Sequence, residues 1–257
     1  MLTHQRKQFL LDLLAREGQI VAKTLSASLG LSEDTIRRDL RELAAEGLLQ
    51  RVHGGALPTL PVLPASPALA PFAGRQQLAQ DAKAAIGRAA GAMIRQGQLV
   101  FIDGGTTAVQ LARQLPRELQ ATVVTHSPSI AVELVQHPLI EVVMLGGRLY
   151  KHSIVNVGAQ TVEAIGRIRA DWYFMGVSSL HPQTGITTGD FEEAAVKRAL
   201  CAASARTVVL ASPEKLQTAS PFQIAPLSEV SDIVTSQQLD QALLAPYREL
   251  GITVTLA

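Results

Sequence analysis

The chain has 257 residues, enough for one large domain or two modest ones. Hydrophobic residues make up 47% of the chain and charged residues 18%, which indicates a packed soluble protein and excludes global disorder. The 23 Lys and Arg residues nearly balance the 22 Asp and Glu residues, so a protein that coats nucleic acid or membranes through its overall charge is excluded, although a local basic face is not.

The single cysteine, Cys201, excludes an internal disulfide and a cysteine-based zinc site, and it favours a reducing compartment. The first residues do not resemble an export signal, because Asp12, Arg16 and Glu17 interrupt any apolar run. No segment approaches the roughly 18 consecutive apolar residues that a membrane helix needs. We therefore expect a cytoplasmic protein that has no membrane partner.

Residues 1–57 are predicted to form a compact helical module with a short β-wing. Apolar residues recur at helical spacing in two segments, and Gly18 and Gly30 are predicted to end these two helices. Ser32 is the predicted N-cap of a third helix that runs to about residue 46. The basic segment that follows, with its Gly54-Gly55 turn, predicts the wing.

A group of arginines lies on the outer face of the predicted third helix. At about 100° per residue, Arg38 and Arg41 lie nearly opposite the apolar face that packs on the first two helices. This arrangement is typical of a helix-turn-helix, whose recognition helix enters the DNA major groove. The alternative is a solvated face on which these arginines pair with neighbouring acidic residues. The predicted DNA-binding residues are Ser32, Glu33, Thr35, Arg37, Arg38, Arg41, Arg51 and His53.

Five prolines between Pro58 and Pro71 predict a break between this module and the rest of the chain. Each proline fixes its own φ and biases the preceding residue toward extended geometry. We therefore expect a semi-rigid linker over residues 58–74. The alternative is a proline-rich loop inside a single domain.

Residues 75–257 are predicted to form one α/β domain. A helix is expected from about Arg75 to Ile94, and short apolar strands alternate with helices after it. This alternation indicates βαβ units and a parallel sheet that is covered on both faces. The predicted strands are residues 99–103, 122–127, 141–147, 171–176, 207–211 and 232–236, and a helix is expected over residues 192–205.

Three of these strands end in small polar residues. The strongest example, Asp103–Thr107, leaves a strand and opens a helix, where glycines permit close approach of a ligand and free N–H groups attract an anion. Thr125–Ser127 and Gly146-Gly147 end two further strands. Ligands of open α/β sheets bind beyond the carboxyl ends of the strands, so the three loops could converge on one site. Each loop alone could equally be a tight turn.

Two later features are open to more than one interpretation. Lys215 follows a strand and could meet a phosphate or be solvated, and the spacing alone favours the solvated state. Asp190 and Glu193 fit a helix capping box.

The sequence LSEDTIRRDLRELAAEGLLQRVHGGA of residues 31–56 resembles the signature of the DeoR family of bacterial transcription regulators. Residues 75–257 resemble the C-terminal sensor domain of that family, which is related in fold to ribose-5-phosphate isomerases. The matching segments are Asp103–Thr107, Thr125–Ser127, Gly146-Gly147, Phe174–Gly176, Gly185–Thr187, Glu192–Lys197 and Lys215.

The resemblance implies an α/β protein with an N-terminal winged helix-turn-helix and a C-terminal α/β sensor domain. It implies binding to double-stranded operator DNA and control by a phosphorylated sugar or related metabolite, without a cofactor or a metal. A homodimer or homotetramer is expected, because one head reads only a short half-site. The implied effector-binding residues are Asp103, Gly104, Gly105, Thr106, Thr107, Thr125, His126, Ser127, Gly146, Gly147, Gly176, Lys197 and Lys215.

Two positions depart from the family pattern near the expected ligand. Ala211 stands where the family usually has an aspartate, and His126 replaces the usual asparagine. Both changes leave the identity of the effector open. The loss of the aspartate also weakens any expectation of isomerase chemistry.

The leading hypothesis is a transcription regulator, a repressor of carbohydrate metabolism genes, that has no catalytic residues. The alternative is a sugar-phosphate isomerase-like enzyme with an appended DNA-binding module. Its base would have to be Asp103 or Glu193, each of which also has a structural interpretation. The six histidines show no metal-binding spacing. A scaffold that binds no effector is a third hypothesis.

Overall fold

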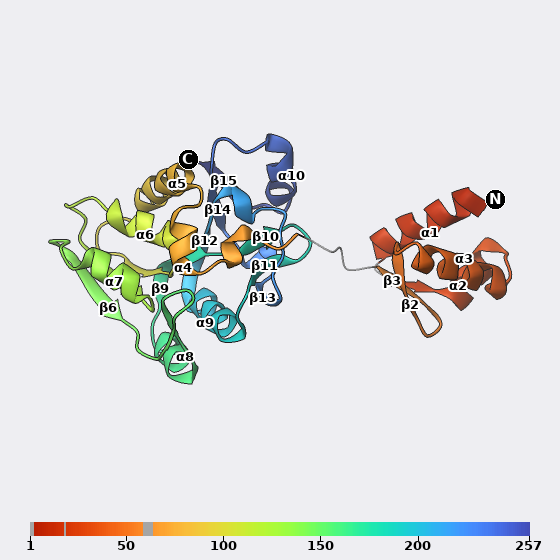
Figure 1. The fold of residues 1–257 in the computed structure, drawn as a ribbon, viewed down its shortest axis with the longest axis horizontal. Helices are drawn as coiled ribbons and strands as arrows, with labels where there is room; N and C mark the ends of the chain where they lie inside the picture. The colour runs from red at the N-terminus through yellow and green to blue at the C-terminus, as the bar shows by residue number, and fades with distance from the viewer. Residues whose placement is uncertain (1–2, 18, 59–63) are drawn as a thin grey trace. The chain divides into compact units, whose positions relative to one another are not determined.

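The computed structural model describes residues 3–17, 19–58 and 64–257 (Figure 1). The chain divides into two compact units, Met1–Val62 and Leu63–Ala257. No helix in the described ranges is both long and apolar enough to cross a membrane.

The first unit contains the three predicted helices and the predicted wing. Its antiparallel sheet has the strand order β1-β3-β2. Leu10, Ile36 and Leu40 belong to the buried core between the helices and the sheet. Gly30 adopts a left-handed conformation, with φ at 62°, and ends the second helix as predicted. The elements are α1 (Thr3–Glu17), β1 (Ile20–Val21), α2 (Ala22–Leu29), α3 (Glu33–Ala45), β2 (Leu49–Val52) and β3 (Gly55–Pro58).

The predicted extended linker over residues 58–74 is wrong in its second half. Pro67–Leu69 forms a 3-10 helix, η1, and Phe72–Gln76 forms α4. Proline is tolerated at the start of a helix, where its missing N–H costs nothing. The buried ring of Phe72 ties this segment to the core of the second unit. Of the predicted linker, residues 59–63 lie outside the described residues.

The single helix predicted from Arg75 to Ile94 is two helices. The chain turns at Ala79, which has a φ of 47°, and α5 (Gln80–Gly91) begins after it. Helical periodicity continues across the break, which is why the sequence pattern does not reveal it.

The second unit contains a sheet of seven parallel strands in the order β15-β14-β12-β9-β4-β5-β6. Six of the strands confirm the predicted ones, and the seventh, β15, was not expected. The strands are β4 (Leu99–Ile102), β5 (Ala121–Thr125), β6 (Ile140–Met144), β9 (Ala170–Gly176), β12 (Ser204–Ala211), β14 (Asp232–Thr235) and β15 (Thr253–Leu256).

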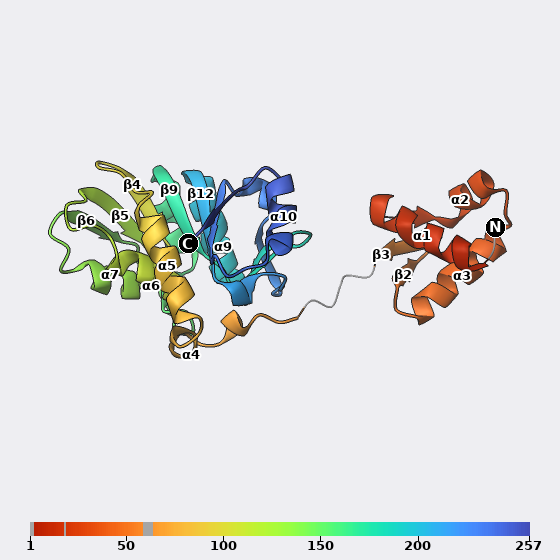
Figure 2. The same ribbon diagram turned by 90° about the horizontal axis from the view of Figure 1, so that it is seen from above.

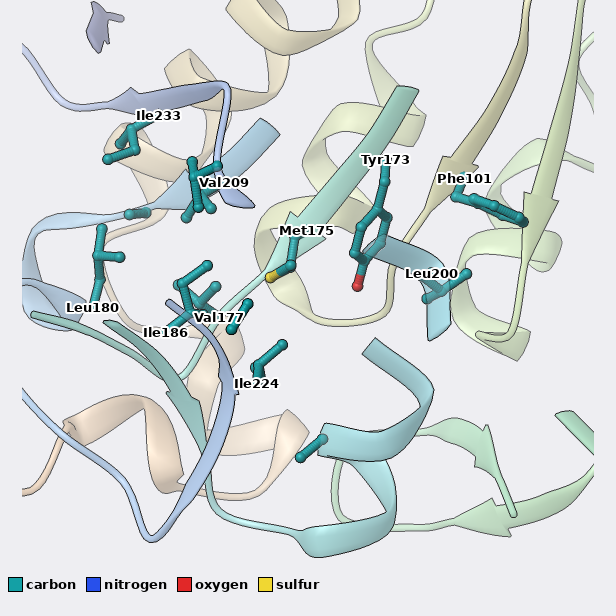
Figure 3. Close-up of a cluster of buried hydrophobic side chains, with 14 of the residues drawn as sticks. Phe101, Tyr173, Met175, Val177, Leu180, Ile186, Leu200, Val209, Ile224 and Ile233 are labelled. Carbon is teal, nitrogen blue, oxygen red and sulfur yellow. The ribbon is translucent and has the colours of Figure 1, made fainter. Parts of the chain in front are cut away.

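Helices cover both faces of this sheet, as predicted (Figure 2). On one face, a cluster of buried hydrophobic side chains packs the sheet against α5, α6 (Thr106–Arg113) and α7 (Pro128–Leu134). The cluster on the other face joins it to α8 (Ala159–Gly166), α9 (Phe191–Ala202) and α10 (Gln241–Glu249). Figure 3 shows part of this second cluster, including Phe101, Tyr173 and Met175.

Several small elements were not predicted. They include the antiparallel sheet β10-β11-β13 and the hairpin of β7 and β8. Their bounds are β7 (Arg148–Tyr150), β8 (Val155–Val157), β10 (Ser179–His181), β11 (Gly185–Thr188), β13 (Phe222–Ala225), η2 (Pro213–Lys215) and η3 (Leu227–Glu229).

The strand order reverses between β4 and β9. From β4 the chain proceeds outward through β5 to β6, and from β9 it proceeds outward in the opposite direction through β12 and β14 to β15. Open α/β sheets bind ligands at such a reversal, beyond the carboxyl ends of the strands. The topology therefore predicts a ligand site formed by the residues that follow Ile102 and Gly176.

Candidate functional site

The third helix of the first unit, α3, begins at a well-formed cap. The Ser32 hydroxyl accepts a hydrogen bond from the Thr35 backbone N–H at 3.2 Å. The two hydroxyls also lie 2.8 Å apart, within hydrogen-bonding distance. Glu33 follows in the first turn, where the helix dipole favours a negative charge. The cap thus fixes where the helix starts.

The buried face of α3 is anchored to α1 by an ion pair. Asp39 is fully buried and accepts hydrogen bonds from the Arg6 guanidinium, one of them at 3.1 Å. On the neighbouring turn, Glu42 pairs with Lys7 of α1 at 3.1 Å. Two of the acidic residues that could have neutralised the arginines of α3, Asp39 and Glu42, are therefore engaged by α1.

The exposed face of α3 retains free arginines. Arg37 pairs with Glu33 at 2.7 Å, as the solvated-face alternative expects. Within the described ranges, the side chains of Arg38, Arg41 and Arg51 have no hydrogen bond or ion pair, and all three are exposed. The wing meets α3 at a hollow of about 270 Å³, which is lined in part by Arg37, Arg41, Arg51 and His53. The structure thus brings three of the four predicted arginines, Arg37, Arg41 and Arg51, together with the wing histidine, while Arg38 is exposed outside this hollow.

In the second unit, the loop Asp103–Thr107 follows β4 and opens α6. Gly105 has a φ of 104°, a conformation that favours glycine. Gly176, at the end of β9, approaches so closely that a Cβ there would lie 2.6 Å from the Gly104 carbonyl oxygen. Both glycines are therefore needed to bring the two strand ends together at the reversal of strand order.

Asp103 is buried at the centre of a saturated hydrogen-bond network. Its Oδ1 accepts from the Gly104 N–H and from His126 Nε2, each at 2.8 Å. Its Oδ2 accepts from the Tyr173 hydroxyl and the Gly176 N–H, each at 2.9 Å, and from the Lys197 ammonium.

These contacts determine the charge of Asp103. Burial by itself would raise the pKa of Asp103, but the charge of Lys197 and the hydrogen bond from His126 outweigh burial and hold the pKa well below its ordinary value. A carboxylate that is permanently ionised and fully hydrogen-bonded is a poor proton acceptor near neutral pH. Asp103 instead holds together β4, β9 and α9.

A small polar hollow lies beside this network, above the loop that opens α6. Cations converge on it from separate parts of the chain, and two carboxylates face it. Lys215, from η2, donates to the Thr107 hydroxyl at 3.1 Å. The lining includes Arg75, Lys83, Gly104, Gly105, Thr106, Thr107, Gly176, Glu193, Lys197, Glu214 and Lys215.

The cations in this hollow are incompletely neutralised. Lys83 donates to the Arg75 carbonyl oxygen at 2.7 Å, and its nearest carboxylate, Glu214, is 3.9 Å away. Burial lowers the pKa of Lys215 to about 7, with Glu214 opposing the shift and Lys83 adding to it. Arg75 Nε is buried and has no hydrogen-bond partner among the described residues. Glu214 Oε2 is also buried without a partner in the described part of the chain. Because four cationic side chains and only two carboxylates line the hollow, it fits an anionic ligand.

Six of the expected effector residues do not line this hollow, and one of them is Asp103, which lies in the network beside it. Thr125 and Ser127 are used internally, because the Ser127 N–H donates to the Thr125 hydroxyl and the Ser127 hydroxyl donates to a backbone carbonyl. His126 faces Asp103 on one side and the Asn156 carbonyl on the other. The Gly146-Gly147 pair packs against α8, where the Gly146 carbonyl accepts from Thr161.

Arg75, Lys83 and Glu214 were not among the predicted effector residues. Lys83 carried a signal in the sequence, since it lies on the buried face of α5 with Ile86 and Ala90 at helical spacing. A lysine on an apolar face requires a special partner. Arg75 carried no such signal, because its position depends on the break at Ala79.

The expected capping box at α9 is present in part. The Asp190 side chain accepts a hydrogen bond from the Glu193 N–H at 2.8 Å. The Glu193 carboxylate does not reach back to the cap. It accepts from the Thr188 hydroxyl at 3.0 Å and lies 3.7 Å from Lys197. No group of three or more potential metal ligands occurs in the part of the chain that the structure describes.

The geometry thus defines a helix-turn-helix unit with a basic recognition helix and an α/β unit with a cationic hollow. Models of known families match both parts. Residues 6–59 match the DeoR-like helix-turn-helix domain, and residues 78–237 match the DeoR C-terminal sensor domain. The chain belongs to the DeoR family of transcriptional regulators. The predicted family and fold class are confirmed.

Similar proteins cover the whole chain. The HTH-type transcriptional regulator GlpR of Haloferax volcanii is 33% identical over 261 residues, which span 99% of this chain and 98% of that protein. The glycerol-3-phosphate regulon repressor of Haemophilus influenzae is 30% identical over 90% of this chain and 88% of that protein. Among solved structures, ribose 5-phosphate isomerase A of Methanocaldococcus jannaschii is similar over 53% of this chain and 54% of that one, with 18% identity and a TM-score of 0.40.

Proposed function

We propose that this protein is a repressor that binds operator DNA through α3 and the wing, and acts in the cytoplasm on genes of carbohydrate metabolism. The observation that carries this proposal is the outer face of α3, where Arg38 and Arg41 are exposed and have no partner among the described residues. Arginines on a recognition helix can donate to guanine edges or to phosphates. The similarity to a glycerol-3-phosphate regulon repressor supports the assignment.

The second part of the proposal is control by a phosphorylated sugar or a related metabolite. Free N–H groups at the start of α6, the Thr106 hydroxyl and the Lys215 ammonium converge on the small hollow. A dianionic phosphate uses all of these donors at once. The ligand would shift operator affinity only through unequal affinity for two conformations of the protein.

The structure favours this role over sugar-phosphate isomerisation. An isomerase needs a carboxylate that can accept a proton near neutral pH. Asp103 is unsuited, because five donors occupy it and its pKa is held low. Glu193 is engaged by Thr188. Incubation of the full chain with pentose and hexose phosphates is expected to give no turnover above that of a boiled control.

The DNA-binding part can be tested without knowing the operator. The full chain would be used to select from random-sequence duplexes, and the selected duplex would be titrated against a scrambled one. We expect the selected duplex to bind about 10³-fold tighter or better. Equal affinity for both duplexes would contradict sequence-specific binding.

The effector part can be tested by thermal unfolding of the full chain. Glycerol 3-phosphate, glucose 6-phosphate, ribose 5-phosphate, inorganic phosphate and unphosphorylated glucose would be compared at matched ionic strength. At least one phosphorylated compound is expected to stabilise the protein, because a ligand of the native state stabilises it by mass action. Stabilisation by glucose alone, or by none of the compounds, would contradict a phosphate-based effector site.

We further infer a symmetric oligomer, a dimer or a tetramer. One recognition helix reads only a short half-site, and a two-fold assembly gains specificity from paired half-sites. Light scattering on the full chain, with and without the selected duplex, is expected to return at least twice the chain mass of 27.4 kDa. A monomer under both conditions would contradict this inference.

A further inference from the structure

The sheet of the second unit ends in two edge strands, β6 and β15, which differ in their exposed side chains (Figures 1 and 2). Large apolar residues are exposed in β6 and directly before it, namely Leu139, Val143 and Met144. All four residues of β15 are described, and none of them is an exposed large apolar residue. Exposed apolar patches mark interaction sites, and natural proteins cover or charge the edges of their sheets. The β6 edge is therefore the one that needs to be covered.

The helix beside this edge, α7, extends the same apolar surface. Glu133 of α7 pairs with Arg113 of α6 at 2.6 Å, so this side of α7 faces α6. At about 100° per residue, Val135, the C-cap residue with helical φ and ψ, lies on the opposite side of the helix, toward the outside of β6. Val132 and Val135 are both 70% exposed. The apolar surface of the β6 edge thus continues onto α7.

The backbone of β6 also has unused hydrogen-bonding groups. The Leu145 N–H donates to the Thr125 carbonyl oxygen of β5 at 2.8 Å. Because these groups alternate between the two sides of a strand, those of Val142 and Met144 face outward. Among the described strands β6 pairs only with β5, so the outward groups have no strand partner there. Such a row of groups is a template for a further strand.

A second copy of β6 fits this edge in one antiparallel register. A two-fold axis at Val142 places this residue opposite its own copy, and the two exchange both backbone hydrogen bonds. The same register places Glu141 opposite the copy's Val143, so the carboxylate does not face its like-charged copy. Glu141 is the only charged residue among the five described residues of β6. The edge is therefore complementary to itself in backbone pairing and in charge.

The same two-fold axis brings the two α7 helices together. α7 packs on both β5 and β6, and neighbouring strands lie about 4.8 Å apart. A helix above this strand pair is therefore two strand spacings, about 10 Å, from its symmetry copy, a distance at which helices pack. A stable dimer buries about 800 Å² per partner, which a pair of five-residue strands alone does not reach. The exposed side of α7, including Val135, supplies the additional contact area.

We propose that the edge formed by β6 and α7 is a two-fold interface between copies of this chain, in which β6 pairs antiparallel with its own copy and the sheet continues across the axis. This inference rests on the proposed oligomer and assigns a surface to it. Val135, Val142 and Val143 do not line the hollow beside α6, so association is expected without any ligand.

The sign of a charge introduced at Val143 tests the interface in the full chain. Val143→Glu places a carboxylate opposite the copy's Glu141 twice in each dimer, whereas Val143→Lys places an ammonium there. Leu250→Glu, at an exposed apolar residue that follows α10, is the matched control. Sedimentation velocity over a range of protein concentrations measures self-association, and circular dichroism checks that each variant is folded.

We expect Val143→Glu to weaken self-association at least roughly tenfold relative to Val143→Lys, because like charges directly opposite each other destabilise a strand pair. Val143→Lys and Leu250→Glu are expected to associate as the wild type does. Wild-type association in Val143→Glu, or equal weakening by both Val143 variants, would overturn the interface alone. A wild type that is monomeric at every concentration would contradict the oligomer and the interface with it, so the two failures are distinguishable.

A disulfide cross-link tests the register directly. In the background Cys201→Ala, which removes the single native cysteine, Val142→Cys and Glu141→Cys would be compared under mild oxidation. Facing residues in such a pair have Cα atoms about 5.5 Å apart, within the range of a disulfide, whereas diagonal neighbours are about 7–8 Å apart. Val142→Cys is therefore expected to form a covalent dimer at least roughly tenfold faster than Glu141→Cys. Equal rates, or faster cross-linking of Glu141→Cys, would overturn the proposed pairing.

Discussion

The basic face of α3 and the hollow beside α6 both gather cations, but they hold them in opposite environments. Arg38 and Arg41 are exposed to solvent, where water and salt screen their charges. Lys83 and Lys215 are buried, with exposed fractions of 2% and 5%. The exposed set fits a long polyanion that is approached from solution, and the buried set fits a small anion that must shed its water.

The difference predicts how each region responds to solution conditions. Exposed cations that release counterions from DNA make binding depend steeply on salt. Buried cations respond less to salt, but their protonation becomes sensitive to pH, as the lowered pKa of Lys215 shows. Salt and pH therefore probe the two regions separately.

Salt should give the largest effect and should separate the regions most clearly. If the oligomer makes 6–10 phosphate contacts, operator affinity is expected to fall by roughly 10³–10⁵ between 50 and 200 mM salt. Effector affinity over the same range is expected to change by less than about tenfold, because the hollow is screened only weakly. Fluorescence anisotropy for DNA and calorimetry for the effector measure the two quantities. If operator affinity and effector affinity fell equally steeply with salt concentration, the proposed difference between the two regions would be contradicted.

Loss of the Asp103 charge should give the next largest effect, on stability. Asp103→Asn leaves the buried Lys197 ammonium with only the more distant carboxylate of Glu193, 3.7 Å away, and is expected to cost roughly 3–5 kcal/mol of unfolding free energy. Chemical denaturation monitored by circular dichroism measures this cost. The double variant with Lys197→Met is expected to recover part of the loss, because no unpaired charge remains. Unchanged stability in Asp103→Asn would show that the network is not structural.

The arginines of α3 should have a smaller effect that is confined to DNA. Arg38→Ala and Arg41→Ala are each expected to weaken binding to the selected duplex by about 1–3 kcal/mol and to leave the helical circular dichroism signal unchanged. Arg167→Ala, an exposed arginine in the other unit, serves as the control. Wild-type affinity in both α3 variants would mean that this face does not touch DNA.

The pH dependence of effector binding should give the smallest effect. In the free protein the pKa of Lys215 is about 7, and a bound dianion favours its charged form, so binding takes up a proton above pH 7. Affinity is therefore expected to fall as the pH rises from 7 to 9, by at most about tenfold per unit. Calorimetry in buffers of different ionisation enthalpy would detect the proton uptake. A flat profile from pH 7 to 9 would place Lys215 outside the phosphate site.

Local patterns in the sequence predicted much of this fold. Ser32 is both a residue type that prefers caps and the start of an amphipathic helix, so two independent signals agreed at α3. The central strands are continuous apolar runs, which buried parallel strands require. Elements whose stability depends on distant contacts were missed, such as the β10-β11-β13 sheet and α10, which contains Pro246.

The effector site was only partly predictable, because sequence order does not give spatial order. Thr106 and Lys215 were identified from their positions after strands, and the structure brings them into one hollow. Gly146 also follows a strand, but that strand is at the edge of the sheet, away from the reversal between β4 and β9. Arg75 reaches the hollow only because the chain turns at Ala79, and nothing in the local sequence indicates that turn.

The central claim is that the hollow and the basic face are energetically coupled, and one measurement tests it directly. Wild type and Thr106→Val would each be titrated with the selected duplex, with and without a saturating concentration of the organic phosphate that the wild type binds. Thr106→Val removes the hydroxyl and barely changes the side-chain volume, and operator binding without ligand is expected to match that of the wild type. The ligand is expected to change wild-type operator affinity roughly 5- to 150-fold and to leave that of Thr106→Val unchanged at the same concentration. An equal response of both proteins would contradict the claim, because the signal would then originate outside the Thr106 loop.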